Sequence, residues 1–168
     1  MSIKVEMGEH QIVSNSTSER YIWTSGVGDC LAIAAQNEDE TLFAHLTGRQ
    51  YYPESMGGGT DEATVAKIKK FLAGCRQSNI LVGTNFRHAG DLKLFASPAI
   101  RLGYAIERLR YGGSDTPGPV TLDIANFQMY FSTPDDVNDQ CNALGDKFGW
   151  TTSKEKKGAK ARCGCVLM

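Results

Sequence analysis

Apolar and polar residues alternate in short runs through the first third of the chain, a pattern typical of strands. Residues 21–24 are predicted to form a strand, and residues 30–35 form an apolar run of strand or buried-helix type whose length favours a strand. The glycines of the intervening Gly26-Val27-Gly28-Asp29 favour a tight turn with positive φ. A polar break at residues 36–40 leads into a third run over residues 41–47. The last two runs together predict a β-hairpin.

The rest of the chain is predicted to mix helices and strands. The expected helices have apolar stripes at helical spacing, and the expected strands have apolar runs or period-two alternation. They are a helix over residues 60–75 capped by Thr60 with Val65, Ile68 and Leu72 facing inward, a strand over residues 79–84, a helix from Ser97-Pro98 to Gly112-Gly113, a long strand over residues 120–131 with a bulge near Ala125-Asn126, and a helix from Thr133 to Phe148. Residues 1–19 are polar, and we expect a loose start in which only residues 11–13 resemble a strand.

This order of elements predicts an α/β or layered α+β fold, with a β-sheet or β-sandwich core and flanking helices. The length of 168 residues suits one globular domain. We expect the folded domain to span residues 1–150 and a flexible tail to span residues 151–168. No run approaches the roughly 18 apolar residues of a membrane span, and the N-terminus lacks the pattern of a signal peptide. We therefore expect neither a membrane-spanning helix nor a cleaved signal peptide.

The cysteines and the charge distribution narrow the class of protein. Cys30, Cys75 and Cys141 lie in the body without regular spacing, which is typical of neither a disulfide framework nor a zinc site and fits a reducing compartment. We expect no metal and no cofactor. The net charge is -1, but residues 154–162 hold five basic residues and one acidic residue, so the rest of the chain carries -5. No nucleic-acid partner is expected.

The last four residues, Cys165-Val166-Leu167-Met168, form a Cys-aliphatic-aliphatic-X motif. Prenyltransferases recognise this motif, and a final Met points to farnesyl. One lipid chain binds a membrane only marginally, so stable anchoring needs a second acyl chain or a basic patch. Cys163 is the candidate palmitoylation site. The candidate basic patch consists of Lys154, Lys156, Lys157, Lys160 and Arg162.

This tail predicts a location. We expect a eukaryotic prenyltransferase to farnesylate Cys165, and the protein then to move from the cytoplasm to the anionic cytosolic face of a membrane. The tail resembles the C-termini of Ras-like GTPases, although the body lacks a phosphate-binding Gly-x-x-x-x-Gly-Lys-Ser/Thr motif. The alternative interpretation is a basic terminus with a fortuitous cysteine.

Cys30 and His45 are the candidate catalytic pair. A nucleophilic cysteine needs a base that takes its proton, a group that orients the base, and N–H donors that stabilise the oxyanion. His45 is the candidate base because the predicted hairpin brings it close to Cys30, and Thr24 could hydrogen-bond the imidazole. The candidate oxyanion donors are the backbone N–H groups of Gly28, Asp29 and Cys30.

The order and spacing of Thr24, Cys30 and His45 resemble those of the glutamine deamidase superfamily, which includes the chemotaxis deamidase CheD, cytotoxic necrotizing factor and the Burkholderia lethal factor. In this superfamily a Gly/Ser turn presents the cysteine and a histidine on the following hairpin completes the site. CheD-like members add a threonine six residues before the cysteine, which is the spacing found here. His45-Leu46-Thr47-Gly48 is similar to the histidine segment of the family. The resemblance covers about residues 21–48 and implies a CheD-like or necrotizing-factor-like fold.

The resemblance implies a cysteine-dependent glutamine deamidase, an amidohydrolase that converts a glutamine side chain of a protein to glutamate. Together with the tail it implies a membrane-targeted bacterial effector or toxin that acts in virulence on a host protein, and a Rho-type small GTPase is the natural guess. Asp29 departs from the family, in which the residue before the cysteine is usually small, and its charge would oppose thiolate formation if it pointed into the site.

Two alternatives to a deamidase remain open. One is a non-catalytic, prenylated binding module tethered to a membrane. The other is a transglutaminase or a protease-type thiol enzyme that uses the same residues on the same fold.

Overall fold

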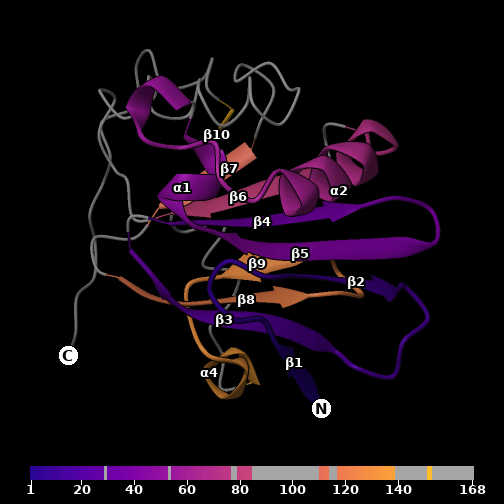
Figure 1. Ribbon diagram of the computed structural model, residues 1–168. Coiled ribbons are helices and arrows are strands. Elements are labelled where there is room, and N and C mark those ends of the chain that lie inside the picture. Colours follow the sequence, from indigo (N-terminus) through magenta and orange to yellow (C-terminus); the bar gives the residue numbers. More distant parts are fainter. Residues whose placement is uncertain are drawn as a thin grey trace.

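Two β-sheets face each other, and helices cover the outer side of the larger sheet (Figure 1). This architecture comes from a computed structural model that describes residues 1–28, 30–52, 54–76, 79–84, 110–113, 117–138 and 151–152. Within these residues the chain mixes helices with two sheets of mainly antiparallel pairing. The coarse prediction of a layered fold with a sheet core and flanking helices is confirmed.

The larger sheet has six strands in the order β10-β7-β6-β4-β5-β2. Its neighbours pair antiparallel except β6 and β7, which are parallel. The strands are β2 (His10–Ser14), β4 (Leu31–Gln36), β5 (Glu40–Leu46), β6 (Ile80–Thr84), β7 (Arg110–Gly113) and β10 (Thr151–Thr152). The predicted hairpin is confirmed as β4 and β5, whose register runs from Leu31 opposite Leu46 to Gln36 opposite Thr41.

The smaller sheet has four strands in the order β1-β3-β8-β9. They are β1 (Ser2–Lys4), β3 (Tyr21–Val27), β8 (Gly118–Asp123) and β9 (Gln128–Tyr130). β3 continues past the expected turn, and Gly26, with φ of 71°, lies where the pairing of β3 with β8 shifts between Thr24 and Val27. The expected positive φ is therefore confirmed at Gly26, but it forms an irregularity within a strand instead of a turn.

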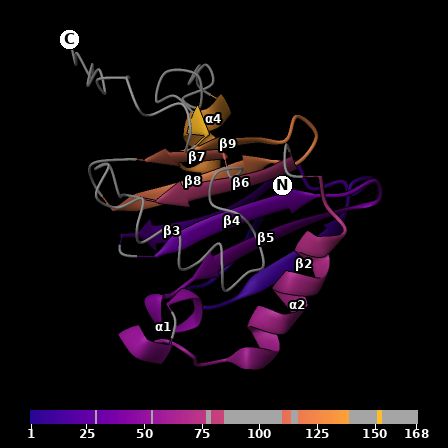
Figure 2. The ribbon, with the colours of Figure 1, turned by 90° about the horizontal axis from the view of Figure 1, so that it is seen from above.

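The core consists of two apolar layers on opposite faces of β4 and β5. Leu31 and Ile33 of β4 belong to the layer beneath helix α2 (Glu62–Ala73), whereas Ala32 and Ala34 belong to the layer between the two sheets. Both faces are buried because a helix covers one and the second sheet covers the other (Figure 2). Successive side chains of these strands therefore enter different layers.

Helix α2 confirms the predicted apolar stripe. Val65, Ile68 and Leu72 are buried against the larger sheet. The helix begins at Glu62 instead of residue 60, and its cap is Asp61 instead of Thr60, because the side chain of Asp61 accepts from the N–H of Thr64. Cys75 is partly buried and packs against the same layer.

The expected loose start over residues 1–19 is wrong. β1 pairs in parallel with β3, and β2 pairs antiparallel with β5, so the N-terminal segment joins both sheets. Val5, between the two strands, is buried in the layer between the sheets, and its N–H donates to the carbonyl of Trp23 at 2.8 Å. Backbone hydrogen bonds at two sheet edges order a segment whose side chains are mostly polar.

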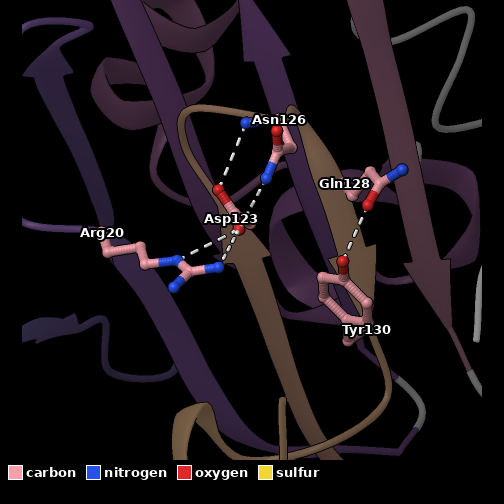
Figure 3. Close-up of polar contacts among 5 residues, drawn as sticks. All are labelled: Arg20, Asp123, Asn126, Gln128 and Tyr130. Carbon is pink, nitrogen blue, oxygen red and sulfur yellow. Dashed lines mark hydrogen bonds and ion pairs between the residues drawn. The ribbon is translucent and has the colours of Figure 1, made fainter. Parts of the chain in front are cut away.

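The single long strand expected over residues 120–131 is instead a hairpin of β8 and β9. The carboxylate of Asp123, 1% exposed, accepts from the backbone N–H and side-chain amide of Asn126 at 3.2 and 3.1 Å, and it also pairs with Arg20 (Figure 3). Phe127 then takes a φ of 48°. An aspartate that bonds the backbone three residues on stabilises a turn, which the alternation of apolar residues did not indicate.

Another expectation fails at residues 110–113, where the second helix was predicted to end. Arg110–Gly113 is strand β7, paired with β6 on one side and with β10 on the other. The rest of that predicted helix lies outside the described residues. The predicted third helix begins at Thr133 as α4 (Pro134–Asn138), and its continuation, including Cys141, also lies outside them.

The domain boundary expected at residue 150 stays a prediction. Residues 151–152 form β10, and residues 153–168 are not among those described. Among the described residues, no helix has the length and apolar character needed to cross a membrane.

Close contact between the sheets predicts a strong cost for enlarging Gly83 of β6. A Cβ atom there would lie 2.9 Å from Met129 Sδ and 3.5 Å from a methyl of Val120. Gly83→Val should therefore lower the free energy of unfolding by about 1–3 kcal/mol in urea titrations. Gly74→Ala, whose added Cβ meets only ordinary contact at 3.5 Å, is the matched control and should change stability by less than about 0.5 kcal/mol. Equal costs for the two variants would contradict the close packing.

Candidate functional site

His45 lies near the end of β5, directly opposite Ala32 of β4. Ala32 and Phe43 both belong to the layer between the sheets, and side chains two residues apart on a strand share a face. The imidazole of His45 therefore enters that layer, where the residue is 0% exposed. Histidine is seldom fully buried without a partner, so its polar contacts decide what it can do.

Thr24 supplies one of these contacts from the other sheet. Its hydroxyl lies 2.7 Å from Nδ1 of His45, and Thr24 itself is 1% exposed. The hydrogen bond that the sequence suggested between these two side chains is thus present. Thr24 is the last regularly paired residue of β3 before the irregularity at Gly26, so the position of its side chain is set by the pairing with Val120. A hydroxyl at Nδ1 leaves Nε2 as the nitrogen available for proton transfer.

The other ring nitrogen, Nε2, is buried and has no hydrogen-bond partner among the residues that the structure describes. A buried polar atom without a partner costs about 1–3 kcal/mol, and such atoms in native proteins call for a functional or structural reason. Burial also lowers the pKa of His45 below its ordinary value of 6.5, while the negative charge of Glu6 partly offsets this effect. His45 is therefore held as a neutral imidazole whose Nε2 is free to take a proton.

Cys30 lies immediately before β4, two residues from Ala32, the residue opposite His45. Diagonal neighbours across an antiparallel pair have Cβ atoms within about 7–8 Å, which long side chains can bridge. Cys30 is partly exposed, whereas His45 is excluded from solvent. The structure therefore brings Cys30 to the same end of the hairpin as His45, with no hydrogen bond from the thiol to Nε2.

The expected oxyanion donors are only partly described. Gly28 is partly buried, and a Cβ atom on it would lie 3.5 Å from Pro117. Asp29 lies outside the described residues, so the direction of its carboxylate and the role of its N–H stay predictions. The irregularity at Gly26 lies between Thr24 and this segment, and irregularities of this kind commonly redirect a strand next to an active site.

Gln50 is a buried polar residue that the sequence reasoning missed. It lies in helix α1 (Gly48–Tyr51), which follows β5 directly and precedes the single turn η1 (Glu54–Met56). Its side chain accepts from the N–H of Thr47 at 2.9 Å, so Thr47 and Gln50 share the N-terminal cap of α1. A threonine followed three residues later by a glutamine is a known signature of a helix start, and it could have revealed this helix.

The remaining expectations concern the tail and metal binding. Cys163, Cys165 and the basic residues of the tail are not among the described residues, so lipidation and membrane binding stay predictions. No group of three or more His, Cys, Asp or Glu side chains arranged to hold a metal ion is found within the described residues.

Comparison with known proteins supplies no relative from which a function could be inferred. No family model matches the chain, and no curated protein matches it significantly. The functional argument therefore rests on the residues that meet around His45.

Proposed function

We propose that the protein is a thiol amidohydrolase that deamidates a glutamine side chain of a protein substrate, and that it has the fold of the CheD and necrotizing-factor deamidases. The observation that carries the proposal is the buried Thr24–His45 hydrogen bond. It orients an imidazole whose Nε2 has no partner among the described residues and which lies at the same end of the β4–β5 hairpin as Cys30. A buried ring nitrogen without a partner among the described residues calls for a reason, and a role in proton transfer supplies one. Here one nitrogen is oriented and the other is unused.

The chemistry follows from the three residues. Nε2 of His45 takes the proton of the Cys30 thiol as the sulfur attacks the carboxamide carbon of glutamine. Backbone N–H groups near Cys30 stabilise the oxyanion, and the tetrahedral intermediate collapses as His45 returns the proton to the leaving nitrogen, which departs as ammonia. His45 then removes a proton from water, and the resulting hydroxide attacks the thioester. Collapse of the second intermediate releases glutamate, and His45 returns the proton to the Cys30 sulfur.

Thr24 has a defined part in this sequence. For Nε2 to act as the base, the neutral ring must carry its proton on Nδ1, and this N–H must donate a hydrogen bond to the Thr24 oxygen, which lies 2.7 Å from Nδ1. The same acceptor stabilises the imidazolium that forms when Nε2 is protonated. A threonine suits this role because its hydroxyl can rotate to accept, whereas a carboxylate would add a second charge to the layer between the sheets.

The tail determines the proposed place of action. Farnesylation of Cys165, supported by the basic residues and by palmitoylation of Cys163, would hold the enzyme at the cytosolic face of a host membrane. Substrates anchored to the same membrane, such as Rho-type GTPases, would then meet the enzyme more often. On this interpretation the protein is a bacterial effector that uses the prenyltransferase of its host.

The first experiment tests the chemistry. Wild-type protein should add about 1 Da per site to a target in intact mass spectra, because an amide becomes an acid, and should release an equal amount of ammonia. Cys30→Ser and His45→Gln should abolish this change, whereas Cys75→Ser is the matched control and should keep it. Cys75 should also react slowly with iodoacetamide, because burial raises the pKa of its thiol.

The outcomes separate the alternatives to a deamidase. Peptide cleavage would identify a protease, and coupling of an added amine to the target would identify a transglutaminase. Equal, slow alkylation of Cys30 and Cys75, with no ammonia from any membrane-bound target, would leave the non-catalytic binding module.

A second prediction concerns Thr24. Thr24→Val keeps the shape of the side chain but leaves Nδ1 of His45 without a partner, so kcat should fall by about 10- to 100-fold, the equivalent of one lost buried hydrogen bond. Thr24→Ser, which keeps the hydroxyl, should retain most of the activity. A Thr24→Val enzyme with wild-type kcat would show that Thr24 does not orient the base.

A third prediction follows from the lowered pKa of His45. The folded protein keeps this ring neutral where the unfolded chain already binds a proton, so stability that is complete above pH 6.5 declines as the pH falls from 6.5 toward the folded-state pKa. Urea unfolding at about pH 7.5 and about pH 5 should therefore show a larger loss of stability for wild type than for His45→Gln. Identical losses would mean that His45 titrates alike in both states.

A fourth prediction tests the location. Cys165→Ser should move the protein from the membrane to the soluble fraction of a eukaryotic cell, while deamidation by the purified protein should be unchanged, because the tail supplies no catalytic group. Neutralising Lys154, Lys156, Lys157 and Lys160 should weaken membrane binding but leave lipid attachment in place. Membrane association that survives Cys165→Ser would refute the prenylation proposal.

A further inference from the structure

We propose that Gln50 is a positioning residue for His45: its side chain clamps the backbone segment that holds His45 to the cap of helix α2. This inference rests on the proposed function for its catalytic consequence, but the clamp itself is a feature of the fold. Gln50 makes no hydrogen bond to the imidazole, and it acts through the main chain of Gly8 and Glu9.

The side-chain amide of Gln50 uses its full hydrogen-bonding capacity while only 4% exposed. Nε2 donates to the carbonyl of Gly8 at 2.8 Å and to Oδ2 of Asp61 at 2.9 Å. Oε1 accepts from the N–H of Thr47 at 2.9 Å and from its hydroxyl at 3.3 Å. An amide has two donor hydrogens and one oxygen with two lone pairs, so no other side chain of this size could make the same four bonds.

The segment that Gln50 holds is bonded directly to His45. The N–H of Gly8 donates to the carbonyl of His45 at 2.8 Å, and the N–H of His45 donates to the carbonyl of Glu9 at 3.0 Å. These bonds continue the pairing of β2 with β5 by one residue beyond its regular end. Gly8 has a φ of 87°, and this left-handed conformation occurs where the Gly8 carbonyl meets Gln50. His45 is thus held by β4 on one side and by a segment that needs Gln50 on the other.

Asp61, which accepts a hydrogen bond from Gln50 at the start of α2, is a charged group. Hydrogen bonds from Thr64 and from Gln50 lower the pKa of Asp61, so it is a carboxylate at neutral pH. A hydrogen bond to a carboxylate is stronger than one between neutral groups. Asp61 also caps α2, and its φ of 56° shows a backbone held in the left-handed region at this junction. The clamp therefore links three separate parts of the chain: the N-terminal segment, the end of β5 and the start of α2.

Loss of the clamp should free the Gly8–Glu9 segment from His45 and admit water beside the ring. Two features of His45 then change without any contact to Gln50: its backbone N–H exchanges with solvent faster, and its ring becomes less buried. Glu6 lies in the same N-terminal segment, and its negative charge raises the pKa of His45. Loosening this segment would therefore also change the effect of Glu6 on that pKa.

The chain offers a matched control in Gln36, at the opposite end of β4. Nε2 of Gln36 donates to Thr41 Oγ1 at 2.9 Å and to the carbonyl of Ile124 at 3.1 Å, so it too is a partly buried amide that joins separate segments. A general loss of stability should follow from Gln36→Met as well as from Gln50→Met. Only Gln50→Met should change the hydrogen exchange and the titration of His45.

The experiment is NMR on the full chain with Gln50→Met, Gln50→Glu, Gln36→Met and Asp61→Asn. In both Gln50 variants, amide exchange at His45 should accelerate by about tenfold or more, as expected for the loss of a buried hydrogen bond. The pKa of the His45 ring should rise toward 6.5, and kcat should fall with KM little changed. Gln36→Met should leave all three properties of His45 as in wild type.

Asp61→Asn keeps the proposal testable if both Gln50 variants fail to fold, because Asp61 is exposed and the change keeps an acceptor. It should accelerate His45 exchange to a smaller degree, since a neutral acceptor replaces a charged one. Folded variants in which His45 exchange and titration match those of Gln36→Met would overturn the clamp. Changed exchange and titration in a protein that deamidates nothing would uphold the clamp and reject the proposed function.

Discussion

The register between β4 and β5 is the constraint on which the rest of the structure depends. Because side chains alternate between the two faces of a strand, the pairing of Ala32 with His45 determines which residues enter each core layer. A slip of one residue would move His45 out of the layer between the sheets and away from Thr24, and it would bring Leu46 into the place of the imidazole. The apolar alternation that forms two cores is therefore the same pattern that positions the candidate base.

Burial of His45 has opposing effects on stability and on chemistry. An imidazole nitrogen without a partner destabilises the fold, and the hydrogen bond to Thr24 offsets only part of that cost. The same burial favours the neutral ring, which is the form that can remove a proton from a thiol or from water. An unfavourable buried group persists only where the surrounding packing is strong enough to hold it, and here two sheets supply that packing.

Several errors of the sequence-based predictions share one cause. The apolar pattern reports which face of an element is buried, but it does not register bonds made by the backbone or by short polar side chains. Residues 1–19 carry few apolar side chains, yet β1 and β2 are ordered by main-chain pairing at two sheet edges. Likewise, the carboxylate of Asp123 turns the chain between β8 and β9 in a stretch whose alternation suggested one continuous strand.

The amino-acid sequence by itself determined the local features of the site. The apolar runs on either side of a polar break predicted the β4–β5 hairpin, and the stripe of Val65, Ile68 and Leu72 predicted helix α2, because these signals depend on residues close in the chain. The sequence also predicted that Thr24 could form a hydrogen bond with the imidazole of His45.

Only the tertiary structure decided that this pairing is a buried contact between two sheets and that Nε2 has no partner within the described part of the chain. It alone joined Gln50 to Gly8 and Asp61, which lie 42 and 11 residues away in the chain. The physical reason is that burial and long-range hydrogen bonds depend on how whole elements pack, and no local pattern of residues encodes that packing.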